Sequence, residues 1–390
     1  MPYKIIQNIP VWGEPIDEAV AQIANCLKTA DYCALMADHH QGYAVPIGGV
    51  VAYRDKISPS GVGYDIACGN KAVRLDIPPQ EVKKHIKQIM DDIYATLSFG
   101  VGMKNEEDVD HPLFHNDSAW NIDVARKLKS LAKSQLGTVG SGNHYVDIFE
   151  DEQARVWVGV HFGSRGFGHK IATHFIQAGG GTDGMFVDPV VLDIKSHLGQ
   201  EYIACMKLAG RYAYAGRDWV CQRVARLLNA RILEEVHNHH NFAWQEEHGK
   251  EKYWVVRKGA TPAFQGQKGF VGGSMGDISV IIEGIASKES SKSLNSTVHG
   301  AGRVMSRTAA AGRFRGRRRQ GGQISRDMMT QWVKKFGVEL RGAGTDESPH
   351  CYKRLPDVLE HHKESIRILH TLKPLGVAMA GEHEFDPYKD

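Results

Sequence analysis

Residues able to bind a metal ion recur at the ends of short apolar segments in this sequence. The glycine-framed turn GVGYDIACG places Asp65 and Cys68 three residues apart. Histidines end or follow other apolar segments in the same way, namely His39, His40, His144, His161, His237, His239, His240 and His299. Any one such histidine is more often a surface or hydrogen-bonded residue than a ligand. Because the pattern recurs, we interpret these residues as parts of one shared pocket.

The chemistry of this set favours a divalent transition metal. A mixture of thiolate, imidazole and carboxylate suits Mn²⁺, Zn²⁺ or Fe²⁺, whereas Ca²⁺ and Mg²⁺ prefer oxygen ligands alone. A lone cysteine such as Cys68 is more often a small buried apolar residue. A thiolate can bridge two cations, however, so one cysteine with three or more histidines could hold a two-metal site. Such a pair suits phosphoryl chemistry, because it holds both the attacking and the leaving oxygen.

Cationic side chains beside glycine or serine form a second recurring pattern. They occur at Arg165, Lys258, Arg303 and Arg307, and the turn GGSMG at 272–276 adds bare backbone amides. Singly, each is more often a turn with a solvated cation. A guanidinium next to free amides is nevertheless a good phosphate cradle. Together with the metal-binding residues, these turns predict a divalent-metal-dependent enzyme of phosphate chemistry.

A cluster of five arginines, Arg313, Arg315, Arg317, Arg318 and Arg319, stands apart from this pattern. Its charge is compatible with a solvated loop and equally with a patch that binds a polyanion. The sequence leaves both interpretations open.

Hydrophobic periodicity predicts the elements that must position these residues. We expect helices over 14–29, 80–97, about 186–236, 324–336 and about 356–370, with His237 to Asn241 at the end of the long one. We expect strands within 33–75 and at 144–149, 154–162, 253–258 and 279–285, and a loop over 104–120. No internal repeat or linker divides the 390 residues. The sequence therefore predicts an α+β fold with interleaved strands and helices, forming a single domain over residues 1–390.

Composition narrows the class of protein. Apolar residues make up 42% and charged residues 24%, which is typical of a globular chain with a sizeable core. The start resembles no signal peptide, and no apolar run approaches the ~18 residues of a membrane span. The six cysteines show no CxxC spacing. Reduced thiols in a cytoplasmic protein, with no membrane partner, are the simplest expectation.

Six longer motifs that contain these residues resemble the RtcB family of RNA-splicing ligases, the 3'-phosphate/5'-hydroxyl RNA ligases. The motifs are GVGYDIACG, LGTVGSGNHY, HFGSRGFGHKI, HHN followed by RKGA, GGSMG and HGAGRVMSR, and they occur in the family's order. The resemblance extends from Asp38 to about Gly376. It implies an α+β, RtcB-like domain around a central metal site.

The resemblance also implies a role for individual residues. Asp65, Cys68 and His144 would hold one Mn²⁺ ion, and Cys68, His161 and His240 would hold a second. His299 matches the residue that receives the guanylyl group of GTP. Positions that contact the guanylate match Asn143, Asp147, Ser274, Ser279, Ala301 and Tyr352. Positions that neutralise phosphates match Arg165, Lys258, Arg303 and Arg307.

The implied reaction joins an RNA 3'-phosphate to a 5'-hydroxyl, as in RNA repair or tRNA splicing. Neutral His299 attacks the α-phosphorus of GTP to give a histidine–GMP adduct and pyrophosphate. The guanylyl group moves to the RNA 3'-phosphate, and the 5'-hydroxyl then seals the strand and releases GMP. A 2',3'-cyclic phosphate is first opened at the same metals. Whether an activating protein partner takes part stays open.

Two departures from the family pattern concern the nucleotide. The family's C-terminal lysine, which contacts guanine, is matched to Ala380, and a glutamate that reads guanine N–H groups is matched to Asp147. They leave nucleotide preference open and indicate a divergent paralogue.

Two other functions remain as alternatives. One is a metal-dependent RNA-end phosphatase or cyclic phosphodiesterase without ligation, which the missing lysine favours and the HGAGR motif and Tyr352 oppose. The other is an RNA-binding protein with a structural metal, which a complete ligand set beside a spare histidine opposes.

Overall fold

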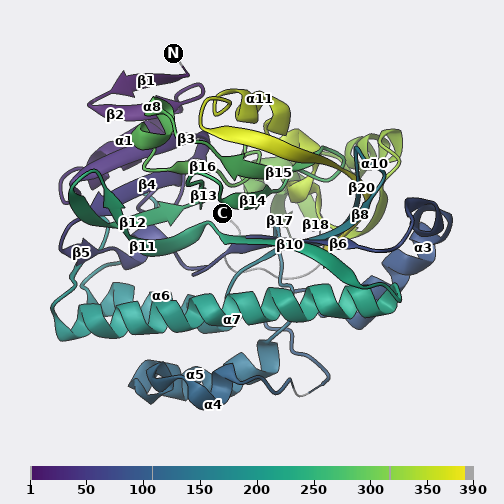
Figure 1. The fold of residues 1–390 in the computed structure, drawn as a ribbon, viewed down its shortest axis with the longest axis horizontal. Coiled ribbons are helices and arrows are strands. Elements are labelled where there is room, and N and C mark those ends of the chain that lie inside the picture. Colours follow the sequence, from purple (N-terminus) through teal and green to yellow (C-terminus); the bar gives the residue numbers. More distant parts are fainter. Residues whose placement is uncertain (1, 108, 316–317, 383–390) are drawn as a thin grey trace.

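Two sheets carry most of the strands of the computed structural model, which describes residues 2–107, 109–315 and 318–382. The first sheet has six strands, in the order β1 (Tyr3–Ile6), β2 (Ile9–Trp12), β3 (Tyr32–His40), β4 (Ile47–Tyr53), β12 (Glu251–Lys258) and β11 (Asn241–His248). The second has eight, in the order β10 (Ile232–His239), β6 (Gly69–Leu75), β8 (Val156–Phe162), β7 (Tyr145–Asp151), β20 (Ile366–Gly381), β15 (Ser279–Gly284) and β14 (Lys268–Val271), with β19 (Glu339–Ala343) beside β20. Runs of strands are interleaved with helices along the chain, which confirms the predicted α+β class (Figure 1).

Three two-stranded pairs complete the strands: β5 (Lys56–Ile57) with β9 (Leu192–Asp193), β13 (Ala260–Pro262) with β16 (Ser296–Val298), and β17 (Gly312–Arg315) with β18 (Arg318–Gly321). The α-helices of the described residues are α1 (Asp17–Cys26), α2 (Pro59–Val62), α3 (Pro79–Thr96), α4 (Leu113–Asn116), α5 (Asp123–Gln135), α6 (Arg165–Ala178), α7 (His197–Leu227), α8 (Lys288–Lys292), α9 (Arg307–Ala311), α10 (Arg326–Lys335) and α11 (Leu355–Glu360). Short 3₁₀ turns cover Ser118–Asn121, Thr345–Glu347 and Pro349–Cys351.

Helix α7 lies beneath both sheets (Figure 1). Ser196 caps its N-terminus, since the Ser196 hydroxyl accepts a hydrogen bond from the Gly199 amide at 3.0 Å. Its first part packs into an apolar cluster with α1, α6 and the six-stranded sheet, and its last part packs with α3 and the eight-stranded sheet. The region around Gly216 and Arg217 thus lies between two cores.

Strand β8 shows how the eight-stranded sheet aims a polar residue at the site. All seven of its residues are buried, because helices cover one face and other elements cover the opposite face. Val156, Val158 and Val160 belong to the cluster with α3 and α7, whereas Trp157 belongs to the cluster with α10. Alternation therefore places His161 on the face of Trp157, away from α7.

The long predicted helix over 186–236 is wrong at both ends. Helix α7 covers only His197–Leu227, and residues 232–239 form strand β10, so the histidines from 237 to 240 do not end a helix. The chain leaves the helix at Asn229, whose φ of 48° lies in the left-handed region. Pairing with β6 along its length then holds the following residues extended, a long-range interaction that overrides local helical preference.

The predicted helix over 356–370 is also wrong beyond Glu360, because β20 begins at Ile366 and pairs with both β7 and β15. Helices α5 and α6 were not predicted, and the expected loop over 104–120 contains the short helix α4 and part of a 3₁₀ turn. The other predicted helices and strands are confirmed with shifts of a few residues.

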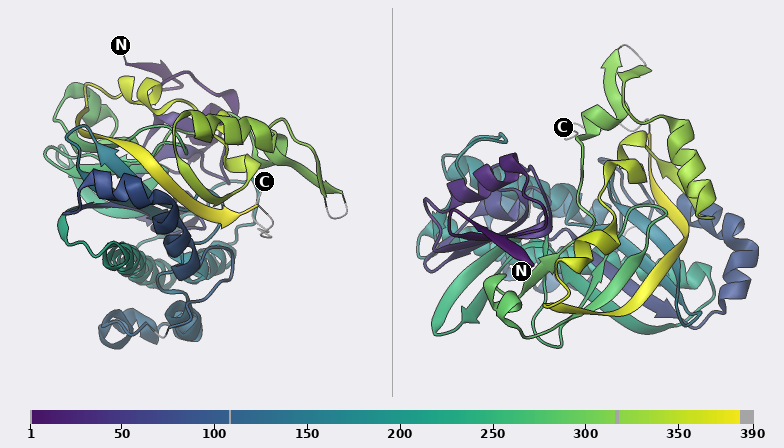
Figure 2. Two further views of the ribbon diagram at one scale, coloured as in Figure 1. Left: turned by 90° about the vertical axis from the view of Figure 1, so that its right-hand side faces the viewer. Right: turned by 90° about the horizontal axis from the view of Figure 1, so that it is seen from above.

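Four residues of the arginine cluster, Arg313, Arg315, Arg318 and Arg319, belong to strands β17 and β18, which form a hairpin that projects from the rest of the molecule (Figure 2). Arg313 is exposed, and Arg317 lies outside the described residues. All six cysteines are free and buried. Within the described ranges, no helix is long and apolar enough to cross a membrane.

Candidate active site

A cavity of about 370 Å³ collects nearly all the predicted site residues. Its wall includes residues from both sheets, among them Lys258 at the end of β12 and His161 in β8. The predicted residues on the wall are Asp65, Cys68, Asn143, His144, Asp147, His161, His240, Lys258, Ser274, His299, Ala301, Arg303, Arg307 and Tyr352. Arg165 and Ser279 do not line it. Ser279 is buried, and its hydroxyl accepts a hydrogen bond from the Gly273 amide in the neighbouring turn.

Neighbouring strand ends bring the proposed ligands together. Cys68 directly precedes β6, His240 directly follows β10, and Gly69 pairs with His239 between these two antiparallel strands. On the other side of β6, Asn70 pairs with His161 of β8. In antiparallel pairs the start of one strand lies beside the end of the next. Residues more than 170 positions apart in sequence therefore meet at the same end of these three strands.

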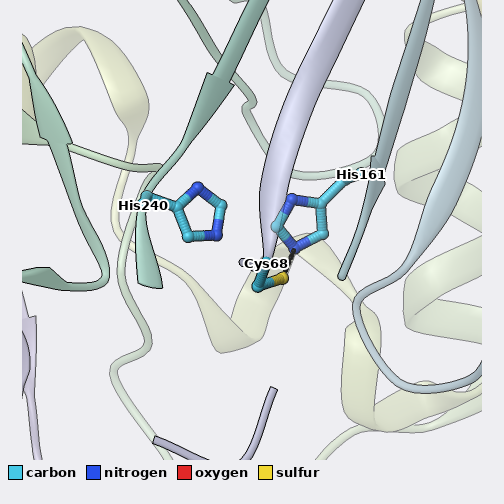
Figure 3. Close-up of side chains that lie close together, drawn as sticks. All are labelled: Cys68, His161 and His240. Atoms are coloured by element: carbon cyan, nitrogen blue, oxygen red, sulfur yellow. Dashed lines mark hydrogen bonds between the residues drawn. The ribbon is translucent and has the colours of Figure 1, made fainter. Parts of the chain in front are cut away.

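Two groups of possible ligand atoms share the Cys68 thiol. One group is Asp65, Cys68 and His144, the other is Cys68, His161 and His240, and within each group the atoms lie within 4.8 Å of one another. Figure 3 shows the second group, with the His161 and His240 rings on either side of Cys68. The Cys68 sulfur lies 3.6 Å from His161 Nε2 and 3.7 Å from His144 Nε2.

The donor chemistry of these groups fits divalent metal ions. Burial lowers the pKa of His161 and His240 well below the usual value, so both imidazoles are neutral and offer a lone pair. The Nδ1 atom of His240 is buried and has no hydrogen-bond partner within the part of the chain that the structure describes. Burial, together with the nearby Asp65 carboxylate, raises the pKa of the Cys68 thiol. A bound cation would offset this effect, because metal coordination deprotonates a thiol.

Neighbouring side chains orient the ligands. The Asn70 amide oxygen lies 2.6 Å from His161 Nδ1, and the Asn70 amide nitrogen donates to the Phe270 carbonyl, which fixes the orientation of the amide. The Arg165 Nη1 atom lies 3.2 Å from His144 Nδ1. Ala67 and Arg165 have φ values of 60° and 57°, and such left-handed conformations cluster at functional sites.

His299 is held by the carboxylate of Asp38, a residue to which sequence reasoning gave no role although it belongs to a polar cluster at the end of an apolar run. Its Nδ1 lies 2.6 Å from Asp38 Oδ2, in strand β3, and the same oxygen accepts hydrogen bonds from the backbone amides of His299 and Gly300. Burial raises the pKa of Asp38, but the His299 imidazole and these donors more than offset it, so the pKa is lowered. The ionised carboxylate keeps the proton on Nδ1, which leaves the Nε2 lone pair free. The sequence signal was the polar run at 38–40 after an apolar segment.

Replacing Asp38 by asparagine should slow any reaction in which His299 acts as a nucleophile. The loss of the carboxylate removes the charge that fixes the imidazole tautomer, an effect of about 10²- to 10⁴-fold in comparable histidine–carboxylate pairs. The rate of nucleotide transfer to the protein, measured at saturating nucleotide, tests this. The surface carboxylate Asp76, which pairs with Arg231, provides the matched control Asp76→Asn. Equal rates for D38N and wild type would contradict a role for Asp38.

Arg303 and Arg307 lie in the segment that follows His299 and are held by acidic groups. Arg307 forms an ion pair with buried Glu347. Arg303 donates to the Tyr352 hydroxyl at 2.9 Å and to the Asp346 carbonyl at 2.8 Å. Lys258 donates to the carbonyls of Tyr43 and Val45. These contacts place three cations on the cavity wall in defined positions.

A different part of the wall is formed by strands β7 and β20. Tyr145 pairs with Met379 and Asp147 pairs with Val377, and all four side chains line the cavity. Asp147 is 6% exposed and its Oδ1 has no hydrogen-bond partner among the described residues, while burial raises the pKa of its carboxyl well above the usual value. The match of the family's lysine to Ala380 stays a prediction. Ala380 packs into the core with α3, because alternation along β20 turns it away from the cavity, and Met379 occupies the wall.

The other histidines of the sequence pattern do not all belong to the cavity wall. His40 lines the cavity. His39 accepts from the Ile16 amide, and His237 and His239 accept from Arg217, so these three have structural partners.

Comparison with known proteins identifies the family of this chain. The family model for tRNA-splicing ligase RtcB matches residues 19–380. The chain is 30% identical to the tRNA-splicing ligase RtcB of Thermococcus kodakarensis, over 93% of this chain and 90% of that protein. It is 28% identical to the RNA-splicing ligase RtcB of Escherichia coli K12, over 96% of this chain and 98% of that protein. By this match over nearly its whole length, and with the family's motifs gathered around one cavity, the chain belongs to the RtcB family of tRNA-splicing ligases.

Proposed function

We propose that this chain is an RNA ligase that joins RNA 3'-phosphate or 2',3'-cyclic phosphate ends to 5'-hydroxyl ends through a histidine–GMP intermediate. One observation carries the proposal. His299, with a free Nε2 held in place by Asp38, lines the same cavity as two ligand groups that share Cys68. A structural metal site would not require a nucleophile held in this way.

The residues fit two divalent cations, which we propose to be Mn²⁺. Asp65, Cys68 and His144 would hold one ion, and Cys68, His161 and His240 would hold the other. When bound, such ions stabilise the charge that develops on phosphate oxygens and help to orient the reacting groups. His240 and His299 have ring centroids 4.9 Å apart, so the proposed nucleophile lies next to a proposed ligand.

The protein's own side chains divide the remaining work. The Nε2 atom of His299 attacks the α-phosphorus of GTP, a phosphorus–nitrogen bond forms, and pyrophosphate leaves with the electrons of the broken phosphorus–oxygen bond. Asp38 holds the proton on Nδ1 of His299 and stabilises the positive charge that develops on the imidazole ring during the attack. Lys258, Arg303 and Arg307, with Arg165 behind His144, supply positive charge toward the phosphates.

We further propose that the guanine base lies on the wall of β7 and β20. Asp147 offers an unpaired carboxyl that can accept hydrogen bonds from guanine N–H groups. Asn143, Ser274, Ala301 and Tyr352 would complete the nucleotide site from the cavity wall, with Ser279 shaping the turn at Gly273. The RNA ends then take the place of pyrophosphate: the 3'-phosphate receives the guanylyl group from His299, and a 5'-hydroxyl displaces GMP.

The wall of β7 and β20 also supports a second candidate function. This is a metal-dependent phosphatase or cyclic phosphodiesterase that does not ligate RNA. None of the described residues on this wall carries a positive charge. The side chains beside Asp147 are the apolar ones of Met379 and Val377. A weakly held nucleotide would leave the metal centre free to hydrolyse RNA ends alone.

Incubation of the protein with Mn²⁺ and α-labelled GTP or ATP distinguishes the two functions. The ligase requires an acid-labile label on the protein and the joining of RNA 3'-phosphate and 5'-hydroxyl ends. Cleavage or dephosphorylation of RNA ends, with no protein label from any nucleotide, would refute the ligase and support the hydrolase. A parallel reaction with cell extract tests whether an activating protein partner is needed, and localisation of a tagged chain tests the expected cytoplasmic location.

Replacing Asp147 by asparagine should reduce labelling with GTP relative to ATP by roughly tenfold or more. The substitution turns one acceptor of guanine N–H groups into a donor, and a mispaired polar group in a buried site costs about 1–3 kcal/mol. Competition between the two labelled nucleotides measures the ratio directly. Met379→Leu, which keeps the wall apolar and of similar volume, should leave the ratio nearly unchanged. An unaltered ratio in D147N would show that the base lies elsewhere.

A further inference from the structure

We propose that Arg217 of α7 is the positioning residue of the metal centre, holding in register the three chain segments that carry Cys68, His161 and His240. The inference rests on the proposed metal site, since it explains how the chain keeps that site assembled. Arg217 is not on the cavity wall, so it acts through the residues that are.

Arg217 donates a hydrogen bond to the residue that stands next to each of these three ligands in the sequence. Nη1 donates to the carbonyl of Ala67 at 3.0 Å, next to Cys68, and to the carbonyl of Phe162 at 2.6 Å, next to His161. Nη2 donates to Nδ1 of His239 at 2.9 Å, next to His240. Nε donates to Nε2 of His237 at 2.8 Å. One planar group therefore spans the ends of β6, β8 and β10.

The environment of Arg217 is unusual for an arginine. The side chain is 0% exposed, and among the described residues it forms no ion pair with a carboxylate. Its partners are two backbone carbonyls and two imidazoles, and because a guanidinium can only donate, His237 and His239 each accept through an unprotonated ring nitrogen. A buried cation without an anionic partner is costly unless its donors are satisfied. Four of the five N–H donors of Arg217 are satisfied, all of them at the metal-binding segments.

The helix and an aromatic stack fix the position of the guanidinium. Arg217 lies where α7 passes from one apolar core to the other. Tyr214, one turn earlier, stacks on His239 with ring centroids 4.0 Å apart and contacts His237 at 4.1 Å. The same helix face thus holds both the guanidinium and two of its acceptors. Lysine could not replace this group, because a single ammonium lacks the planar fork that reaches all four acceptors.

The substitution Arg217→Lys tests the inference with Co²⁺ as the probe. Cysteine-bound Co²⁺ gives a thiolate-to-metal charge-transfer band, which reports binding at Cys68 without any activity measurement. We expect R217K to weaken Co²⁺ binding by about 10- to 100-fold, the usual effect of losing an interaction that orients metal ligands. Circular dichroism of the same samples shows whether the variant is folded.

Arg257→Lys is the matched control. Arg257 is also 0% exposed and makes several hydrogen bonds, but to Glu246, Ser296 and Leu294, away from the ligand segments. We expect R257K to keep the Co²⁺ affinity of the wild type. Folded R217K with wild-type affinity, or an equal loss in both variants, would overturn the role of Arg217.

A second variant decides the matter if R217K does not fold. His239→Phe keeps the stacking on Tyr214 but removes the Nδ1 acceptor, so Arg217 loses its hydrogen bond toward His240 and keeps the other three, while the ring also loses its contact with the Ala67 backbone. We expect an intermediate, several-fold loss of Co²⁺ affinity, and unchanged affinity in H239F would overturn the inference. If the wild type itself binds no Co²⁺, the proposed metal centre fails and the inference with it. If the wild type binds and the variants match it, only the role of Arg217 fails.

Discussion

Replacing His299 by alanine should abolish both the nucleotide label on the protein and the joining of RNA ends. Loss of a covalent nucleophile lowers the rate by about 10⁴-fold or more, because no other group can form the intermediate. The protein should still fold. The side chain is partly exposed, and Asp38 keeps its two backbone amide donors when the imidazole is removed. The measurements are acid-labile label, ligation and thermal unfolding on the same preparation.

A matched control removes an imidazole far from the cavity. His197, at the start of α7, has a side chain that is 89% exposed, so His197→Ala should keep full labelling and ligation. Metal content should be equal in H299A and wild type, since His299 belongs to neither ligand group. An acid-labile label that persists in H299A would assign the nucleophile to another residue. Ligation that persists without any label would refute a covalent mechanism.

Replacing Cys68 by alanine should remove both metal ions at once. Cys68 is the one residue common to the two ligand groups found among the described residues at the cavity, so its loss takes a ligand from each. We expect the affinity for Mn²⁺ to fall by about 100-fold or more at both sites, because loss of a ligand should cost at least as much as loss of a residue that only orients one. Equilibrium dialysis followed by elemental analysis measures the number of ions bound and their affinity. Labelling by GTP should disappear in parallel.

Two comparisons make this result specific. Cys221 is also a free and fully buried cysteine, but it lies in the core with α3, so Cys221→Ala should keep both ions. His144→Ala and His240→Ala each remove a ligand from a single group, so each should weaken one ion more than the other. Two ions bound by C68A with wild-type affinity would refute the shared thiol.

Several elements show how much of the fold could be predicted from the sequence. Helix α3 was predictable from a helical periodicity that also describes its burial, and strand β8 from a nearly continuous apolar run, since all of its residues are buried. Strand β10 was not, since residues 232–239 satisfy a helical pattern as well and become extended through pairing with β6. The long strand β20 likewise depends on partners, β7 and β15, that are far away in sequence. Local preference decides an element only where distant pairing does not compete with it.

The sequence by itself identified the family and predicted the types of ligand and the candidate nucleophile, because long motifs keep those residues in order. Only the tertiary structure decided which of these residues meet. It joined Cys68 to two ligand groups, placed Asp38 against His299, and brought Arg217 beneath three segments. It also turned Met379 rather than Ala380 toward the cavity. These contacts depend on strand register and on side-chain direction, and both are set by pairing between residues distant in sequence.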